Sequence, residues 1–266
     1  MRRNQRLCCL TLVLLLLVSV PSAFAEEGRV QGTVWHDDTP DGLMNDEACV
    51  PGAVIVLEKM AGEGGITETA RTESDENGFY SLTVPETGTY RLRVELPADY
   101  LVFSLFGQDS SVLPIQGSIG FTRYFETAGG ENKTMNIGAS KSSGATVTIV
   151  VYNDANGNGS RASGEKLLSN VRVGLLYEYE GETWTVAELT PSFVTKYGIR
   201  LKFLSPGTYR AYFEVPKGYR VGPMGSKFSG WYSCFTQEGD MAYTVPFTVG
   251  LRDNQYIGAG VMKIRK

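Results

Sequence analysis

One stretch of the chain carries residues with the types and spacing of a metal-binding loop. Counted from Asp154 as position one, oxygen-bearing side chains stand at positions three, five, seven and twelve, and a glycine stands at position six. With this spacing a twelve-residue loop surrounds a calcium ion, and its last residue, a glutamate, offers two oxygens. We therefore predict calcium ligands at Asp154, Asn156, Asn158, Glu165 and the main-chain carbonyl of Ser160.

The same residues also suit a plain turn, because Asn and Gly are frequent between strands. The complete twelve-position pattern favours calcium over this alternative. Only two of the predicted ligands, Asp154 and Glu165, are carboxylates. Since low ligand charge weakens calcium binding, we expect a Kd on the order of 10⁻⁴ M.

A shorter copy of this loop follows Asp37. Asp37, Asp41 and Glu47 occupy the matching positions, but one residue is missing between Gly42 and Glu47, and Pro40 stiffens the loop. The missing residue argues against Glu47 as the terminal two-oxygen ligand. A plain acidic turn is therefore slightly favoured here over a second calcium site.

The segments that must position these loops alternate apolar and polar residues, as half-buried strands do. Helical periodicity is nearly absent after residue 25. The apolar members of the alternating runs are Tyr80-Leu82-Val84, Tyr90-Leu92-Val94-Leu96, Val147-Ile149-Val151, Val171-Val173-Leu175, Tyr197-Ile199-Leu201-Phe203 and Tyr209-Ala211-Phe213-Val215. Strands with one apolar face must pack sheet against sheet. The predicted fold class is all-β, with two tandem antiparallel β-sandwich domains.

The two halves of the chain match each other segment by segment, which is the mark of an internal repeat. Residues 87–100 match residues 206–219, and both segments end in the motif P-x-x-Y. The loops that begin at Asp37 and Asp154 each follow the first predicted strand of their half. We therefore predict a first sandwich over 26–140, a small polar linker over 141–144 and a second sandwich over 145–266.

These motifs resemble the B-type repeats of serine-aspartate repeat surface adhesins. The motifs are a D-x-N-x-[DN]-G loop, a D-x-x-G-x-Y element at Asp75 to Tyr80 and a G-x-Y-x6-P-x-x-Y element, for example from Gly207 to Tyr219. The resemblance implies a prealbumin-like, Ig-like sandwich related to the B-type domains of the collagen adhesin. Such domains often form a Lys–Asn cross-link, but residues 29–36 and 145–152 contain no Lys, so we predict none, although Asn136 is placed as a last-strand partner.

The first 25 residues have the pattern of a secretory signal peptide. A basic start is followed by the apolar run from Leu10 to Val20 and by Ala23-Phe24-Ala25, and no later anchor is expected. Removal of Arg2, Arg3 and Arg6 leaves 22 of the 25 basic residues against 29 acidic ones, a net charge of −7. We therefore expect a secreted protein that does not bind nucleic acid and does not insert into a membrane.

Other reactive residues are few. His36 is the sole histidine, so a Ser-His-Asp or Cys-His site would have to include it, and an exposed structural role is favoured. Cys49 and Cys234 are the cysteines that remain after residue 25. One buried thiol in each domain is favoured, and an interdomain disulfide is the alternative.

Loop aromatics suggest a second kind of site. Trp231 and Tyr232, in a stretch rich in Gly and Ser, are the residues predicted to contact a ligand; Trp184, Tyr177 and Tyr179 are further candidates for stacking on a sugar. The leading interpretation is a secreted, non-enzymatic structural or adhesion module with a calcium-stabilised loop in its second domain. The alternative is an accessory module that binds an extracellular carbohydrate or peptide.

Overall fold

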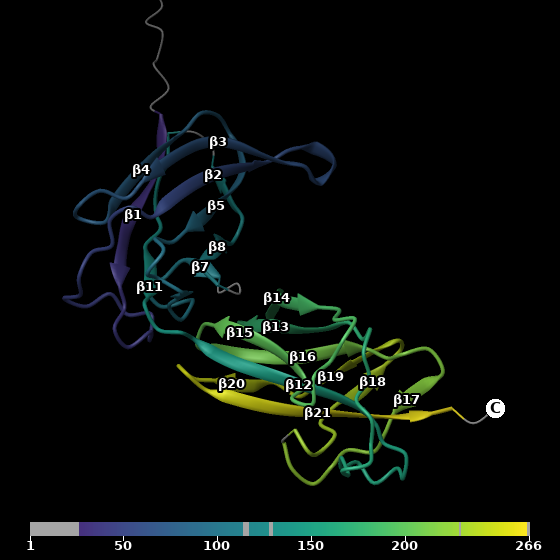
Figure 1. Ribbon diagram of the computed structural model, residues 1–266. Coiled ribbons are helices and arrows are strands. Elements are labelled where there is room, and N and C mark those ends of the chain that lie inside the picture. The colour runs from purple at the N-terminus through teal and green to yellow at the C-terminus, as the bar shows by residue number, and fades with distance from the viewer. Residues whose placement is uncertain (1–26, 114–116, 128–129, 229, 265–266) are drawn as a thin grey trace, which may run out of the picture.

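The protein is built from β-strands, with one short 3-10 helix, η1 (Gly62–Gly64), in the part of the chain that is described. The computed structural model describes residues 27–113, 117–127, 130–228 and 230–264, so the predicted signal peptide lies outside the described residues. The strands form four sheets. The all-β prediction is confirmed, and Figure 1 shows the strands up to β11 gathered at one end and those from β12 onward at the other.

The first half of the chain contains two sheets. In the first, β1 (Gly28–His36) pairs with β4 (Phe79–Val84), β10 (Asn132–Thr134) and β11 (Ile137–Ser140), and β11 pairs with β6 (Val102–Phe103). In the second, the order is β3 (Ile66–Glu73), β2 (Val54–Met60), β5 (Gly88–Glu95), β8 (Ile119–Thr122) and β7 (Val112–Leu113), and β9 (Phe125–Thr127) also pairs with β5.

The second half repeats this plan. One sheet has the order β15 (Ile199–Leu204), β12 (Ala145–Asn153), β21 (Asn254–Lys263) and β17 (Tyr219–Val221). The other has the order β14 (Glu182–Leu189), β13 (Val173–Tyr179), β16 (Gly207–Glu214), β19 (Met241–Tyr243) and β18 (Thr236–Glu238), and β20 (Phe247–Val249) also pairs with β16. The strand orders of the two halves therefore correspond, with β10 and β11 of the first half together taking the place of β21.

Most strand pairs are antiparallel, as predicted, but each half also contains a parallel pairing. β1 runs parallel to β10 and β11, and β12 runs parallel to β21. Parallel neighbours need a long connection, and here nearly the whole half lies between the first strand and the last. In each half the first strand is thus paired with the last.

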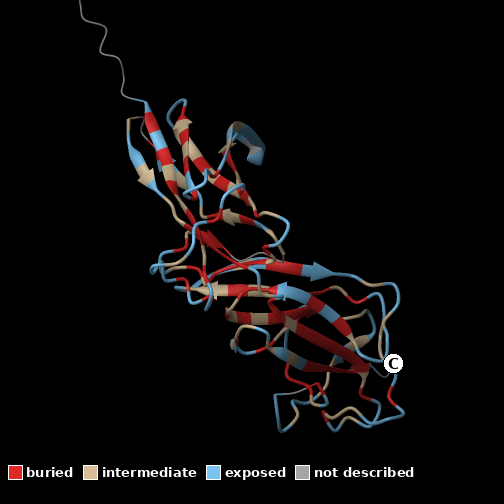
Figure 2. Cartoon of the chain, turned by 60° about the vertical axis from the view of Figure 1, so that its left-hand side comes forward, coloured by how far each residue is buried: buried red, intermediate tan, exposed pale blue. Residues whose placement is uncertain are grey.

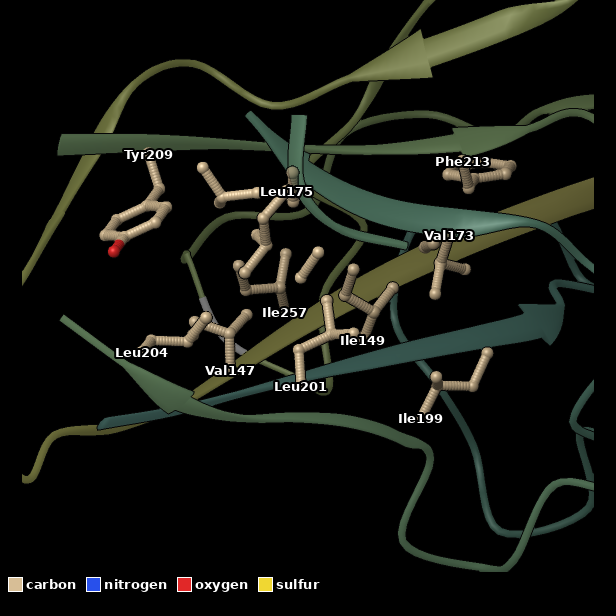
Figure 3. Close-up of a cluster of buried hydrophobic side chains, with 14 of the residues drawn as sticks. Val147, Ile149, Val173, Leu175, Ile199, Leu201, Leu204, Tyr209, Phe213 and Ile257 are labelled. Atoms are coloured by element: carbon tan, nitrogen blue, oxygen red, sulfur yellow. The ribbon is translucent and has the colours of Figure 1, made fainter. Parts of the chain in front are cut away.

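The core of each half lies between its two sheets, as the alternation predicts. Figure 2 shows the buried residues along the strands and the exposed ones mainly in the loops. In the first half Tyr90, Leu92 and Val94 of β5 are fully buried. The second core combines residues of β12, β13, β15, β16 and β21, including Val147, Leu175 and Leu201 (Figure 3).

The alternation predicted for residues 197–203 fails at both ends. Ile199 and Leu201 are buried, but Tyr197 is 51% exposed and Phe203 is 41% exposed. Phe203 has a φ of 57°, and the pairing of β12 with β15 shifts register beside it. This irregularity turns Phe203 outward and lets the next residue, Leu204, enter the core.

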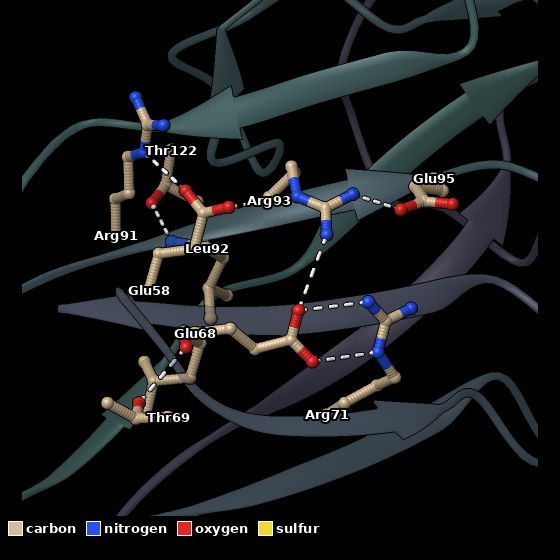
Figure 4. Close-up of polar contacts among 10 residues, drawn as sticks. Glu58, Glu68, Thr69, Arg71, Arg91, Leu92, Arg93, Glu95 and Thr122 are labelled. Carbon is tan, nitrogen blue, oxygen red and sulfur yellow. Dashed lines mark hydrogen bonds and ion pairs between the residues drawn. The ribbon is translucent and has the colours of Figure 1, made fainter. Parts of the chain in front are cut away.

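A charge network covers the outer face of the second sheet in the first half. Glu58, which is 8% exposed, accepts hydrogen bonds from the Nε atoms of Arg91 (2.8 Å) and Arg93 (2.9 Å), as Figure 4 shows. Arg93 also contacts Glu95 and lies 3.7 Å from Glu68. Because Glu58 lies on β2 and both arginines lie on β5, this carboxylate ties the two adjacent strands together through side chains.

The two halves meet through aromatic side chains and one arginine. The ring of Phe106 lies 4.9 Å from that of Tyr179, whose hydroxyl donates to the carbonyl of Gly107 at 3.1 Å. Gly107 has a φ of 96°, and a Cβ there would stand 2.2 Å from the Tyr179 ring, so a side chain at this position would prevent the contact. Arg123 lies 5.0 Å from the Trp184 ring and 3.2 Å from Glu182.

Candidate functional site

The predicted calcium loop of the second half begins directly after β12 and is organised around Asp154. This side chain is 1% exposed, and its Oδ1 accepts hydrogen bonds from the backbone N–H groups of Gly157 (2.9 Å) and Asn158 (3.2 Å). Its Oδ2 accepts from Gly159 at 2.9 Å. Three backbone dipoles thus point at one carboxylate, and the chain curls around it.

Two asparagines continue the same pattern along the loop. Asn156 Oδ1 accepts from the backbone of Asn158 at 3.0 Å, and Asn158 Oδ1 accepts from the backbone of Ser160 at 2.8 Å. Ser160 forms an isolated β-bridge with Tyr232. The amide oxygens of these residues are therefore oriented along the loop by local hydrogen bonds, as in Asx turns.

The last predicted ligand, Glu165, folds back onto the start of the loop. Its Oε1 accepts from the backbone of Ala155 at 2.9 Å, and its Oε2 accepts from Ala162 at 2.9 Å. Both carboxylates, Glu165 and Asp154, are buried. They are two of the causes, after burial, that raise the pKa of the neighbouring Tyr152. The sequence-predicted residues thus belong to one closed, negatively charged loop.

The shorter loop of the first half has the same construction. Asp37 is fully buried, and its two carboxylate oxygens accept from the backbones of Thr39 (3.1 Å) and Gly42 (2.8 Å). Asp41 Oδ1 accepts from Leu43 at 2.9 Å. Gly42 stands five residues after Asp37, as Gly159 does after Asp154, so the two glycine N–H groups occupy equivalent places.

Despite the missing residue, Glu47 takes the place that Glu165 takes in the longer loop. Glu47 Oε1 accepts from the backbone of Asp38 at 3.0 Å, and Asp38 directly follows the first aspartate, as Ala155 does. The other oxygen, Oε2, is enclosed and accepts no hydrogen bond. Within the described ranges, no group of three or more His, Cys, Asp or Glu side chains has the arrangement of a metal site, so amide and main-chain oxygens would have to complete either loop.

Each loop is fastened to a later segment of its own half. In the first, the backbone N of Met44 donates to Asp109 Oδ2 at 2.8 Å. In the second, Ser233 donates to the carbonyl of Gly159 at 2.8 Å, and Arg161 donates to the carbonyl of Trp231 at 2.7 Å. The residues between Tyr219 and Phe235 therefore depend on the loop for part of their backbone bonding.

The two predicted ligand-contact residues in this segment have different surroundings. Trp231 is 60% exposed and lines a groove with Tyr197 and Tyr256. Tyr232 is half-buried, packs close to Gly225 and does not line that groove. Sequence reasoning missed Tyr256 and placed Tyr197 on a buried strand face; the outward turn of Tyr197 is visible only in the structure.

The further aromatic candidates serve the interior and the junction between the halves. Tyr177 is 1% exposed and packs edge-on against Tyr209, with ring centroids 5.3 Å apart. Tyr179 and Trp184 both pack against Phe106 of the first half. These side chains are therefore committed to protein contacts.

His36 and the cysteines form no reactive group that the structure describes. His36 is partly buried, with Nε2 2.8 Å from Asp38 Oδ1 and its ring edge-on to Tyr100. Cys49 and Cys234 are not joined to each other by a disulfide, so the interdomain bridge considered as an alternative is not formed. Cys234 is buried as expected, but Cys49 is exposed, because it directly follows the surface loop and joins β1 only through an isolated backbone bridge to Trp35.

Known proteins are similar to this chain in sequence. It is 31% identical over 187 residues to serine-aspartate repeat-containing protein C of Staphylococcus aureus strain Newman, and the same figures hold for strain N315. Over most of its length this chain is similar to a serine-aspartate repeat protein. The match covers 70% of the chain and 18% of the relative, and it confirms the resemblance to the B-type repeats predicted from the motifs.

No family model matches the chain. Among solved structures, a streptococcal ancillary pilin superposes with a TM-score of 0.36 at 15% identity, covering 91% of this chain and 64% of the pilin. The shaft pilin SpaA of Lactobacillus rhamnosus GG gives 0.30 at 10% identity, covering 90% and 99%. Scores this low say nothing about function. Within the described ranges no helix is long and apolar enough to cross a bilayer.

Proposed function

We propose that this protein is a secreted, non-enzymatic structural module that works outside the cell or at its surface. The observation that carries the proposal is the direct connection of two matching sandwiches through a packed junction. β11 ends at Ser140 and β12 begins at Ala145, so the connection is only four residues long. Phe106, Tyr179 and Trp184 fill the space beside it. A pair of domains held in this way acts as a stiff spacer.

The similarity to serine-aspartate repeat-containing protein C supports this function, because that name describes no reaction. The chain spans only 18% of that protein's length, so what the whole relative binds does not transfer to it. We expect its extracellular partner to be a protein or a glycan. We expect the protein neither to bind nucleic acid nor to insert into a membrane.

Small-angle X-ray scattering of the full chain tests the stiff spacer. We expect one set of interatomic distances that stays the same between low and high salt. The double variant Phe106→Ala and Arg123→Ala removes side chains that pack at the junction, and it should broaden the distance distribution without changing the unfolding of the separate sandwiches. A wild-type profile that already requires freely hinged domains would overturn the proposal.

Calcium stiffening of the loops is the finer part of the proposal. The second loop offers carboxylate and amide oxygens, and hard oxygen donors are those that calcium prefers. In the first loop, the enclosed Glu47 Oε2 lacks a hydrogen bond, and a cation near it would supply the missing partner. An ion held by both ends of a loop stabilises the folded domain by mass action, by about 2.7 kcal/mol at a hundred times its Kd.

Thermal unfolding in calcium and in chelator tests this part separately. The unfolding midpoint should rise in calcium and stay unchanged in magnesium at the same ionic strength. The variant Asn156→Ala removes a predicted ligand whose side-chain oxygen accepts a local hydrogen bond from the backbone of Asn158. It should reduce the calcium-dependent rise while leaving the midpoint in chelator nearly unchanged. Equal midpoints with and without calcium would remove the ion and leave the spacer function intact.

A further inference from the structure

A groove of about 510 Å³ runs over the outer face of the sheet formed by β15, β12, β21 and β17. Its floor is formed by Val150 of β12 and Tyr256 of β21. The neighbours of these residues along the strands, Ile149, Val151 and Ile257, point into the core. The groove therefore lies on the face of the sheet that is turned away from the core.

Three aromatic side chains on the walls and floor are exposed to an unusual degree. Trp231 is 60% exposed, Tyr197 is 51% exposed and Tyr256 is 44% exposed. They come from three separate segments and are brought together only by the fold. Gly230 makes this possible, because a Cβ at this position would stand 2.8 Å from Tyr256 Cβ. Clustered exposed rings of this kind mark a surface that contacts a ligand.

The charged side chains around these rings are all positive. Arg161 and Lys196 line the groove, and no acidic residue does. The Arg161 guanidinium lies 5.6 Å from the Trp231 ring centroid, and Lys196 Nζ and Arg200 Cζ lie 5.0 and 5.3 Å from that of Tyr197. In the part of the chain that is described, none of these three cations forms a salt bridge, and Arg161 Nε is enclosed without a hydrogen-bond partner. The groove is thus a basic site on an acidic protein, whose full chain has a net charge of −4.

We propose that this groove binds an oligosaccharide that contains uronic acid. The flat C–H faces of sugar rings stack on exposed Trp and Tyr rings. The planar guanidinium of Arg161 matches a carboxylate with two parallel hydrogen bonds. In the groove, cations alternate with aromatic rings, and this pattern suits an oligosaccharide with about one negative charge per sugar. A heavily sulfated oligosaccharide would need a groove lined by a continuous row of cations. The volume lies in the range of small-molecule sites, roughly 300–1,000 Å³.

An extended peptide fits the groove less well. Peptides often add a strand to a free sheet edge and bind through backbone groups. The strands under this groove, β12 and β21, are paired with each other and are not edge strands of the sheet. Recognition here must therefore rely on side-chain faces and charges, which are the groups that a charged sugar engages.

The test is calorimetric titration of the full chain with four probes of matched length: an oligogalacturonate, a neutral β-glucan oligosaccharide, a sulfated oligosaccharide and an oligoglutamate peptide. We expect the oligogalacturonate to bind at least about tenfold more tightly than each of the others. Trp231→Ala and Arg161→Gln should each weaken its binding about tenfold. Phe193→Ala, at an exposed aromatic outside the groove, should leave it unchanged.

Several results would overturn the proposal: no binding of the oligogalacturonate, equal binding of the neutral, sulfated or peptide probe, or binding that is unaffected by Trp231→Ala in a variant that still unfolds cooperatively. The groove proposal does not rest on the spacer or calcium proposals. Titrations in calcium and in chelator separate these proposals, because an absence of oligogalacturonate binding in both conditions would refute the groove proposal and leave the spacer and calcium proposals untouched.

Discussion

The backbone N–H of Arg161 donates to the carbonyl of Trp231 at 2.7 Å, and its guanidinium stands 5.6 Å from the centroid of the Trp231 ring. One residue of the predicted calcium loop thus holds the exposed tryptophan through both its backbone and its side chain. An ion in the loop between Asp154 and Glu165 would alter the surroundings of the tryptophan.

Trp231 should therefore report calcium binding by fluorescence. We expect tryptophan emission of the full chain to change on addition of calcium, and Trp231→Phe to remove most of that change. Glu165→Gln should remove the same portion, because it takes a charge from the second loop. Glu47→Gln is the matched control in the first loop and should retain it. A calcium response that Trp231→Phe leaves intact would place the ion elsewhere.

The two loop aspartates should contribute to stability to a similar extent. Asp154→Ala leaves the backbone N–H groups of Gly157 and Gly159 without an acceptor, and Asp37→Ala leaves those of Thr39 and Gly42, whereas Asn158 keeps Asn156 Oδ1 as an acceptor. Unsatisfied buried donors cost about 1–3 kcal/mol each, so the free energy of unfolding should fall by roughly 2 kcal/mol or more for each substitution. Urea unfolding in chelator measures both.

Asp240→Ala is the control for this comparison. Asp240 is exposed, and substitutions at such positions usually change stability by less than about 0.5 kcal/mol. An equal, small effect of all three substitutions would show that the loops do not need their first carboxylate.

Glu58 should matter more to the first half than its exposed neighbour Glu68. Glu58→Gln removes the carboxylate charge that interacts with Arg91 and Arg93. We expect the free energy of unfolding to fall by about 1–3 kcal/mol, toward the lower end because both arginines are partly exposed. The Glu68 side chain is 45% exposed, so Glu68→Gln should cost below about 1 kcal/mol. Unfolding in low and high salt checks the pair, because salt should screen the exposed contact more strongly.

Buried tyrosines should make the protein sensitive to alkali. Burial raises the pKa of Tyr177 to about 12 and also raises that of Tyr209. Because the ordinary value of about 10 applies after unfolding, the stabilisation is complete below about pH 10 and is lost as pH rises through the folded pKa. The free energy of unfolding should therefore fall steadily from about pH 10 to 12.

Tyr177→Phe provides the control, since it removes one titrating hydroxyl. The free energy of unfolding of this variant should decline less steeply with pH than that of the wild type. Each protein is compared with its own free energy of unfolding at pH 8. Tyrosinate absorbance followed in the same samples should rise together with unfolding. Absorbance that is complete while the protein is still folded would contradict the assignment.

The sequence by itself determined the strands, the repeat and the composition of the two loops. Alternation at Tyr90, Leu92 and Val94 suffices because a strand exposes successive side chains to opposite faces, so the buried set follows from order along the chain. The turn at Asp154 is equally local, since the hydrogen bonds that the side chains of Asp154, Asn156 and Asn158 accept all come from residues within five positions.

The tertiary structure alone decided what distant segments bring together. Spacing argued against Glu47, but the backbone of the shorter loop places this carboxylate against Asp38, as Glu165 is placed against Ala155. Trp231, Tyr197 and Tyr256 share a groove because the segment just before β15 and the segment from Gly230 to Trp231 meet over β21. Such meetings depend on packing between segments, and periodicity within any one segment contains no information about them.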